Sequence, residues 1–172
     1  MAAYILGIQP RRRLFNIRKL KQVRLSIRQR ISTLLGKSIV LFHKLRGCDI
    51  GNHCLISRSA IIDRAHPKGV HIGDNTRVLM EAMIIAHDYS RGALAGYDTW
   101  CHTYIGKNCV IGGRAMIMPG VKIGDHVYVA GGAIVSKSVP DHCIVAGNPA
   151  KIVRTGTVIS DGGQILEKGE RV

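Results

Sequence analysis

An aliphatic residue recurs at every sixth position between residues 105 and 136 of this 172-residue chain, and a small or slim residue follows four places after it. The aliphatic positions are Ile105, Ile111, Ile117, Ile123, Val129 and Val135, and the slim positions are Cys109, Ala115, Val121, Val127 and Ala133. A unit of six residues cannot bury its apolar face alone, whereas stacked units share one continuous core. The repeat therefore predicts a β-helix.

The same phase continues upstream. It gives Ile50, Ile56 and Ile62 and, after a four-residue insertion, Ile72, Val78 and Ile84. At three hexads per coil, twelve hexads amount to about four triangular turns. β-branched residues favour strands at these positions, and Gly, Asn and Asp favour the turns. We therefore predict one β-helical domain over residues 47–154.

Residues 47–154 resemble the left-handed β-helix hexapeptide acyltransferases. The likeness is strongest at residues 119–125 (PGVKIGD) and 146–151 (AGNPAK), which are typical of the sugar and polysaccharide O-acetyltransferase branch. The resemblance implies an all-β, left-handed parallel β-helix, a hand that spacing alone does not supply because ordinary crossovers are right-handed. It also implies acetyl-CoA as the donor and a homotrimer with active sites between subunits. Direct transfer to a hydroxyl, without an acyl-enzyme, is implied as well.

The regular phase is interrupted once at length, between Ile84 and Ile105, and His87 stands where this loop leaves the scaffold. Loops on a rigid scaffold often carry function. The resemblance implies that His87 is the general base, and an imidazole is suited to taking the hydroxyl proton and returning it to the thiolate. Asp88, Asp98 or a backbone carbonyl are alternatives for the group that orients the ring. The competing interpretation is a loop histidine with a structural role.

The same loop supplies candidate acceptor-binding residues, namely Asp88, Tyr89, Asp98 and Trp100. Trp100 offers an apolar face for a sugar ring, with loop packing as the alternative. Cys101 and His102 are a weak candidate for a nucleophile and its base, because adjacent residues on an extended segment point to opposite sides.

The donor site is also implied by the resemblance. Small residues would let a pantetheine arm approach the backbone, and hydroxyl and basic groups would contact the nucleotide phosphates. The matching positions are Gly113, Gly131, Gly132, Ser136, Lys137 and Arg154. Two positions depart from the family: Val110 replaces a Trp, and Glu81 stands where sugar-modifying relatives often have Asn.

The first 46 residues differ from the rest of the chain. They contain twelve of the 25 Lys and Arg residues and no Asp or Glu, so they account for most of the net charge of +14. Apolar residues recur there every three or four places, which predicts a cationic amphipathic helix. They are Leu14, Ile17, Leu20, Val23, Ile27, Ile31 and Leu34.

Three interpretations of this basic extension remain open. An anionic membrane surface, contacted through residues 11–46, suits its apolar stripe and its cations. A helix packed on the β-helix or on a partner is the second. Nucleic acid is the third, which the scarcity of aromatic residues disfavours.

No segment is apolar and long enough to span a bilayer, and the N-terminus does not match a secretory signal. Five cysteines without a Cys-x-x-Cys pair predict a reducing compartment, with Cys54 and Cys109 as core thiols. We therefore expect a cytoplasmic protein that is peripheral on the inner membrane face.

We predict an O-acetyltransferase that acts on a sugar hydroxyl of a surface or capsular polysaccharide precursor. The main alternative is a small-molecule acetyltransferase of the xenobiotic or serine type. A γ-type zinc carbonic anhydrase is disfavoured, because His66 and His71 have a usable offset but no third ligand is evident, and no metal is expected. A non-catalytic scaffold is the last alternative.

Residues 155–172 are predicted to form a hairpin around Asp161-Gly162. It would suit an open end of the β-helix, whose unpaired edge would otherwise recruit other chains.

Overall fold

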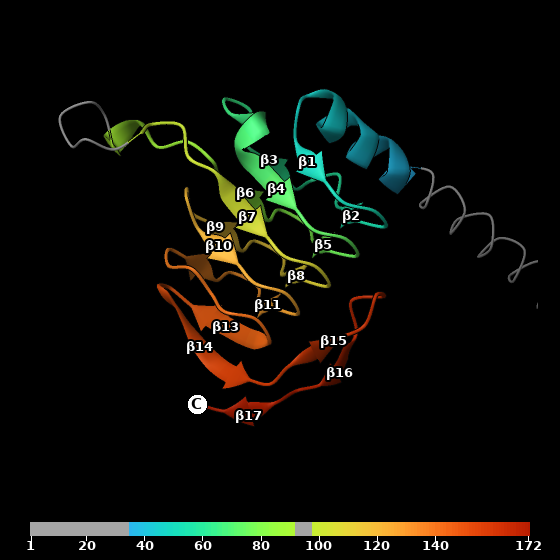
Figure 1. Cartoon of the computed structure of the whole chain (residues 1–172), viewed down its shortest axis with the longest axis vertical. Helices are drawn as coiled ribbons and strands as arrows, with labels where there is room; N and C mark the ends of the chain where they lie inside the picture. Colours follow the sequence, from blue (N-terminus) through green and yellow to red (C-terminus); the bar gives the residue numbers. More distant parts are fainter. Residues whose placement is uncertain (1–34, 92–97) are drawn as a thin grey trace, which may run out of the picture. The chain divides into compact units, whose positions relative to one another are not determined.

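A computed structural model describes residues 35–91 and 98–172, and three parallel sheets form the sides of a β-helix (Figure 1). Sheet A contains β1 (Asp49–Ile50), β4 (Val70–Ile72), β7 (Thr103–Ile105) and β10 (Lys122–Ile123). Sheet C contains β3 (Ile61–Ile62), β6 (Met83–Ile84), β9 (Met116–Ile117) and β12 (Ile134–Val135). Sheet B begins with β2 (Leu55–Ile56), β5 (Arg77–Val78), β8 (Val110–Ile111) and β11 (Tyr128–Val129). Each of four coils therefore gives one strand to each sheet, as the twelve hexads predict.

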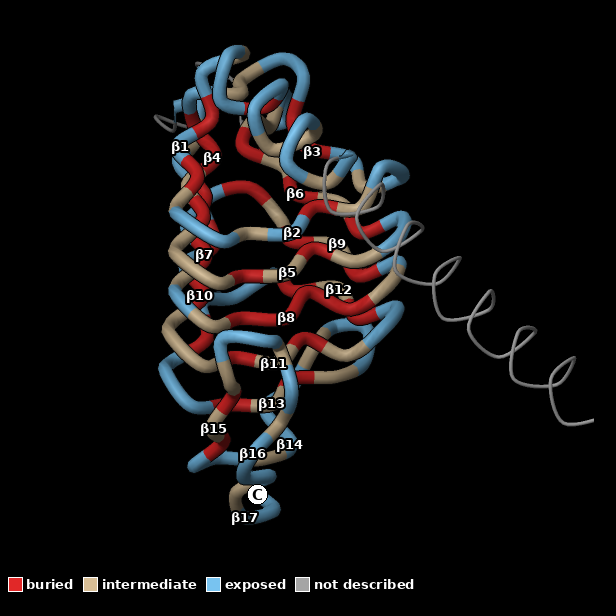
Figure 2. Tube along the Cα trace, turned by 90° about the vertical axis from the view of Figure 1, so that its right-hand side faces the viewer, coloured by how far each residue is buried: buried red, intermediate tan, exposed pale blue. Residues whose placement is uncertain are grey.

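The core follows the hexad phase. All twelve aliphatic positions are buried, and within each sheet they pair in register with the same position of the next coil, as Ile62 does with Ile84 and Ile84 with Ile117. Figure 2 shows the buried positions recurring from coil to coil. The slim positions are buried as well, including Cys109, whereas Cys54 in the first coil is only partly buried. The first coil has a neighbouring coil on one side only, which accounts for this difference.

Two insertions fall at the same corner of the triangle, between sheets C and A. In regular coils Ile105 pairs with Ile123, eighteen residues further on. Ile50 pairs with Ile72, because residues 63–69 form an insertion that includes the 3-10 helix η1 (Pro67–Gly69). Ile72 pairs with Ile105, because the longer loop lies between them and includes η2 (Tyr89–Arg91). The register thus brings the start of one insertion directly beside the start of the other.

The C-terminal segment continues sheet B and then turns back along the coils. Strands β13 (Cys143–Gly147), β14 (Ala150–Thr155) and β17 (Glu170–Arg171) extend sheet B beyond β11. The predicted hairpin forms from β15 (Val158–Ile159) and β16 (Ile165–Glu167). Its backbone is bonded to the corner between sheets A and B, where His126 Nδ1 lies 3.0 Å from Ile159 O and His142 Nδ1 lies 2.9 Å from Thr157 O. The hairpin is confirmed, and it lies against a corner of the coils.

An α-helix over residues 35–45 precedes the first coil. Ile39 and Val40 pack against the core, and His43 is buried, so this face of the helix covers the first coil. Packing on the β-helix, one of the three interpretations, therefore holds for this short segment. The apolar stripe predicted over residues 14–34 lies outside the described residues. Within the described part of the chain, no helix is long and apolar enough to cross a bilayer.

Candidate functional site

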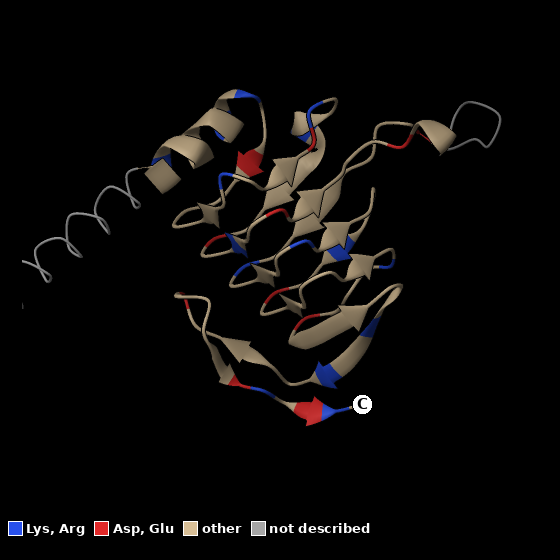
Figure 3. Cartoon of the chain, turned by 180° about the vertical axis from the view of Figure 1, so that it is seen from behind, with Lys and Arg blue, Asp and Glu red and all other residues tan. Residues whose placement is uncertain are grey.

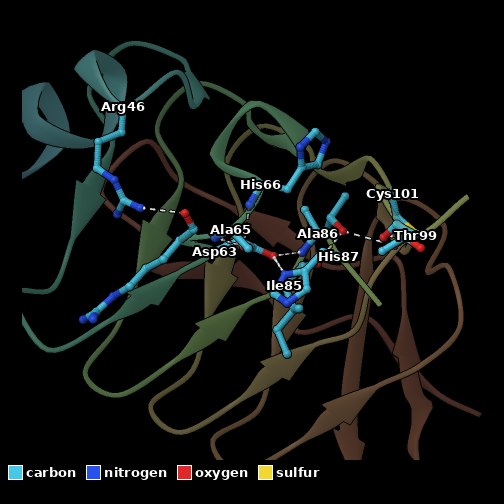
Figure 4. Close-up of polar contacts among 12 residues, drawn as sticks. Arg46, Asp63, Ala65, His66, Ile85, Ala86, His87, Thr99 and Cys101 are labelled. Carbon is cyan, nitrogen blue, oxygen red and sulfur yellow. Dashed lines mark hydrogen bonds and ion pairs between the residues drawn. The ribbon is translucent and has the colours of Figure 1, made fainter. Parts of the chain in front are cut away.

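His87 and Asp63 form a hydrogen-bonded pair at the corner that holds both insertions (Figure 4). His87 Nδ1 lies 2.6 Å from Asp63 Oδ2. The Asp63 side chain is fully buried, and the His87 side chain is 24% exposed. Asp63 directly follows the core residue Ile62, and His87 lies three residues after Ile84, which pairs with Ile62 in sheet C. The stacking of these two coils therefore places the carboxylate beside the imidazole.

Backbone amides hold the Asp63 carboxylate in its ionised form. Oδ2 also accepts a hydrogen bond from Ala86 N at 2.6 Å, and Oδ1 accepts from Ala65 N at 2.8 Å and His66 N at 2.9 Å. Burial alone would raise the pKa of Asp63, but these amide bonds and the contact with His87 outweigh it and lower the pKa. An ionised carboxylate only accepts, so Nδ1 of His87 is assigned as the donor, and in the neutral imidazole the lone pair is therefore on Nε2.

The base of the loop is a short antiparallel pairing that fixes the backbone of His87. His87 and Trp100 form a β-bridge, Asp88 N donates to Thr99 O, and Cys101 N donates to Ala86 O. Neither acidic residue of the loop is the partner of the His87 ring: Asp88 Oδ1 accepts from Ser90 N, and Asp98 Oδ1 accepts from Trp100 N. The partner is Asp63, which was not among the alternatives considered from the sequence.

Two aromatic rings flank the imidazole. The centroid of Tyr89 lies 5.0 Å from that of His87, and the centroid of Trp100 lies 6.2 Å from it. Both rings are exposed, and they lie edge to face at 6.0 Å. Tyr89 and Trp100, predicted as acceptor-binding residues, are therefore next to His87.

A pocket of about 600 Å³ opens beside His87 on the outer side of sheet C. Its floor is apolar and includes Ile61, Met83 and Met118, while His87, Asp88 and Tyr89 form a polar rim. Arg64 also lines the pocket. Of the predicted acceptor-binding residues, Asp88 and Tyr89 line this pocket, whereas Asp98 and Trp100 lie at the base of the loop. An apolar pocket with a few polar groups and an oriented imidazole can bind a small organic molecule and accept a proton from it.

Five of the six predicted donor-binding residues lie at the two ends of strands in sheet C, whereas Arg154 lies in β14 of sheet B. Gly113 precedes β9, Gly131 and Gly132 precede β12, and Ser136 and Lys137 follow β12 and are exposed. Gly132 N donates to Gly113 O at 2.9 Å, so these glycines are stacked in neighbouring coils. A Cβ on Gly131 would lie 3.2 Å from Gly113 O, and Gly132 has a φ of +71°, which favours glycine. None of these residues lines the pocket beside His87.

Arg154 and Glu81 each have a partner elsewhere. Arg154 Nη1 donates to Gly169 O at 2.9 Å, so its guanidinium contacts the C-terminal segment. Glu81 Oε2 accepts from Arg114 Nε at 2.7 Å at the corner that contains Gly113. Val110, which replaces a family Trp, is buried in β8 of sheet B.

The histidines considered for metal binding form a different cluster on the outside of sheet A. His71 Nε2 lies 2.9 Å from His102 Nδ1, and His71 Nδ1 lies 3.2 Å from Asp49 Oδ2. His66 contacts His102 through its ring edge. Within residues 35–91 and 98–172, no group of three His, Cys, Asp or Glu side chains has a geometry suited to a metal ion. Cys101 Sγ contacts carbonyl oxygens of Asp98 and Thr99.

Asp63 is the main residue of the candidate site that could not be named from the sequence. A usable signal was present, because the first insertion begins at Asp63 and the second begins near His87, both after a sheet C hexad. Counting coils across the four-residue insertion would have placed the two residues at one corner.

Comparison with known proteins identifies the family of this chain. Residues 102–137 match the family described as bacterial transferase hexapeptide (six repeats). The "Putative acetyltransferase YvoF" of Bacillus subtilis (strain 168) is 30% identical over 132 residues, which cover 73% of this chain and 71% of that protein. The chain belongs to the hexapeptide-repeat acyltransferase family. The predicted family is thereby confirmed, and so is the assignment of the chain to the acyltransferases.

Two further matches bear on the fold and on the length of the protein. Serine acetyltransferase 2 of Arabidopsis thaliana is 35% identical over 108 residues, and the chain spans about a third of that enzyme, 32% of its length. A hexapeptide-repeat acetyltransferase of Vibrio cholerae O1 biovar eltor, solved in complex with acetyl coenzyme A, matches at 26% identity with a TM-score of 0.54. This match covers 63% of this chain and 60% of that one. Together with the family match, it confirms the left-handed parallel β-helix.

Proposed function

We propose that this protein transfers an acetyl group from acetyl-CoA to a sugar hydroxyl, with His87 as the general base. The observation that carries the proposal is the His87–Asp63 pair beside the pocket. Because Asp63 fixes the proton on Nδ1, Nε2 of His87 is free to accept the proton of the acceptor hydroxyl as its oxygen attacks the thioester carbonyl. The C–S bond then breaks, and Nε2 returns the proton to the thiolate sulfur.

Asp63 has a positioning role in this proposal. When His87 becomes an imidazolium, the adjacent carboxylate stabilises the positive charge and keeps the ring in place, as the acid does in a Ser-His-Asp triad. The three backbone amides on Asp63 hold the carboxylate in turn. The proton is transferred by His87 alone.

The loop supports a sugar as the acceptor. Tyr89 and Trp100 present exposed aromatic surface with ring centroids 5.0 and 6.2 Å from that of His87, and aromatic faces pack against the C–H faces of sugar rings. Asp88 and Asp98 belong to the same loop, and in our proposal their carboxylate oxygens accept hydrogen bonds from sugar hydroxyls. A surface or capsular polysaccharide precursor is the acceptor that we propose.

The outer side of sheet C has features that suit the binding of acetyl-CoA, the proposed donor. Met83, Met116 and Ile134 point outward from successive strands and form an apolar strip, with the glycines at one edge and Ser136 and Lys137 at the other. The corner after β6 and the corner after β12 are two coils apart, or about 10 Å along the axis. In our proposal the pantetheine arm lies along this strip, and the phosphates are near Lys137. Arg154 has a backbone partner in the tail, so its contact with a phosphate would require that bond to be replaced.

The same strip supports a homotrimer with its active sites between subunits. Ile61, Met83, Met116 and Ile134 are apolar residues at outward positions, and a row of this kind favours burial by a second copy of the chain. In this arrangement the neighbouring subunit would form the second wall of the open pocket. Sedimentation of the purified protein measures the assembly directly.

A panel of acceptors tests the proposed reaction. The full-length protein is mixed with acetyl-CoA and with nucleotide sugars, lipid-linked glycans or free serine, and the release of free coenzyme A thiol is followed. We expect release with a sugar acceptor, together with an acetyl ester on the product. If serine alone is acetylated, the acceptor is an amino acid and not a sugar. If no acceptor leads to release of coenzyme A, the proposed reaction is contradicted.

The serine-type reaction is the second candidate, and one observation favours it. Serine acetyltransferase 2 of Arabidopsis thaliana is 35% identical to this chain, although the match covers only 32% of that enzyme. Both candidates acetylate a hydroxyl and both use His87 and Asp63 in the same way. The acceptor panel therefore separates them, whereas variants of the pair do not.

A further inference from the structure

The helix of residues 35–45 has two different faces. Ile39 and Val40 pack on the core and His43 is buried, as described above. On the other side Leu41, Phe42 and Leu45 are 57%, 56% and 79% exposed. Three large apolar side chains within five residues are more than isolated surface hydrophobics, and such a patch marks an interaction site.

Cations surround this exposed face. Lys37 and Lys44 are exposed on the same helix, and the guanidinium of Arg46 lies 5.7 Å from the centroid of the Phe42 ring. The first acidic residue of the chain is Asp49, so nothing in the helix neutralises these charges. Figure 3 shows Lys and Arg on the helix and on the segment that follows it.

We propose that this face, formed by Leu41, Phe42 and Leu45 with Lys37, Lys44 and Arg46, docks on an anionic lipid bilayer. Apolar side chains enter the boundary between headgroups and acyl chains, while Lys and Arg remain near the phosphates. Two other occupants, a second copy of this chain and a nucleic acid, fit this face less well. A second copy would bring two cationic faces together, and a nucleic acid would leave the three apolar side chains in water.

A hydrogen bond connects this face to the pocket. Arg46 Nη2 donates to Arg64 O at 3.1 Å, and Figure 4 draws this bond as a dashed line from Arg46. Arg64 lines the pocket together with Asp63 and Ala65. A bilayer bound to the helix therefore lies near one wall of the pocket. If the proposed function holds, this position suits an acceptor whose sugar is attached to a lipid. This consequence rests on the proposed function, but docking itself does not.

Cosedimentation with vesicles tests the docking surface independently of acetyl transfer. The full-length protein is mixed with vesicles of phosphatidylcholine, with or without phosphatidylglycerol, at low and at high salt. We expect binding to the anionic vesicles only, and weaker binding at high salt. Phe42→Asp with Leu45→Asp should lower the partition on the order of tenfold or more, since two apolar side chains no longer enter the lipid. Lys37→Gln with Lys44→Gln should lower it roughly fivefold for each cation removed.

Matched controls use exposed residues at the far end of the chain. Leu166→Asp removes an exposed leucine, and Lys168→Gln with Arg171→Gln removes two exposed cations, so both should bind vesicles as the unmodified protein does. Binding of the Phe42 and Leu45 variant at full strength would overturn the proposal, because residues 1–34 would then suffice. A clear fall in its thermal midpoint, or a change in its oligomeric state, would also overturn it, because the face would then be covered within the protein or by a second copy. Preferential binding to nucleic acid in competition with vesicles would overturn it as well.

Discussion

Sheets A and C have the same short strands and the same stacking register, yet their outer faces differ completely. Sheet A presents polar or aromatic side chains, Asp49, His71, Tyr104 and Lys122 in order along the stack. Sheet C presents Ile61, Met83, Met116 and Ile134. The buried hexad positions of both sheets are Ile or Val, so the repeat fixes the scaffold while the outward residues decide its use.

The two histidine clusters sharpen this contrast. His71 and His102 are bonded to each other outside sheet A, whereas His87 is bonded to a buried carboxylate at the end of sheet C and lines a pocket. Both ring nitrogens of His71 have hydrogen-bond partners, the exposed Asp49 carboxylate and the His102 ring, so neither is available to a substrate. Substitutions at matched positions of the two regions therefore test whether function is confined to the sheet C side.

The largest effect is expected for His87→Ala. Loss of the general base should lower kcat for acetyl transfer on the order of 10²–10⁴-fold. The protein should remain folded, with a thermal midpoint lowered only by the loss of the hydrogen bond to Asp63, whose carboxylate keeps its bonds to three backbone amides. Steady-state release of free coenzyme A measures this. The matched control is His71→Ala in sheet A, which should leave kcat within about twofold. Near-normal turnover of the His87 variant would contradict the proposed mechanism.

Asp63→Asn should affect both activity and stability. We expect kcat to fall on the order of 10²-fold, because an amide can stabilise the wrong tautomer of His87. A shift in the pH profile of kcat, with KM for acetyl-CoA unchanged, would separate this positioning role from general damage.

Acid unfolding reports on the same residue. The pKa of Asp63 is lowered in the folded protein from its ordinary value of 3.8, so the unfolded state binds the proton more readily. The free energy of unfolding contributed by this group is present above pH 3.8 and is lost as the pH falls below it through the folded value. Denaturant titrations at a series of pH values should show this loss in the unmodified protein and a smaller slope in Asp63→Asn. An equal slope in both proteins would contradict the assignment.

Met116→Glu should disrupt the assembly that we propose on the outer face of sheet C. A carboxylate in a buried apolar interface should weaken association at least roughly a hundredfold, because the charge has no partner there. Sedimentation velocity measures the change. Lys122→Glu on the outer face of sheet A, in the next strand along the chain, should leave the assembly unchanged. If both variants dissociate, or neither does, sheet C is not the interface.

The smallest effect is expected for Lys137→Gln at the end of β12. Loss of one cation near the donor phosphates should raise KM for acetyl-CoA roughly three- to tenfold and leave kcat nearly unchanged. Lys107→Gln, an exposed lysine at a different corner, is the control and should not change KM. An unchanged KM for Lys137→Gln would show that the phosphates lie elsewhere.

Several features of this protein could be predicted from the sequence. The hexad phase identified the twelve buried aliphatic positions of the coils, the number of coils and the interruption that contains His87, and turn chemistry identified the C-terminal hairpin. Each of these depends on local periodicity or on local turn residues. The helix of residues 35–45 was predicted as part of a longer amphipathic segment, but its two faces were not distinguished. Which side chains pack on the first coil depends on the direction in which the chain enters the β-helix.

The sequence by itself determined the repeat, the buried positions of the hexads and the position of the loop, since a six-residue period specifies which side of each strand faces inward. Only the tertiary structure decided that Asp63 orients His87, that the tail lies along the corner of His126 and His142, and that Arg46 reaches the pocket wall. These contacts join residues in different coils or in segments outside the repeat. Their register follows from how the insertions are accommodated in the stack, and a period counted along one chain does not contain that information.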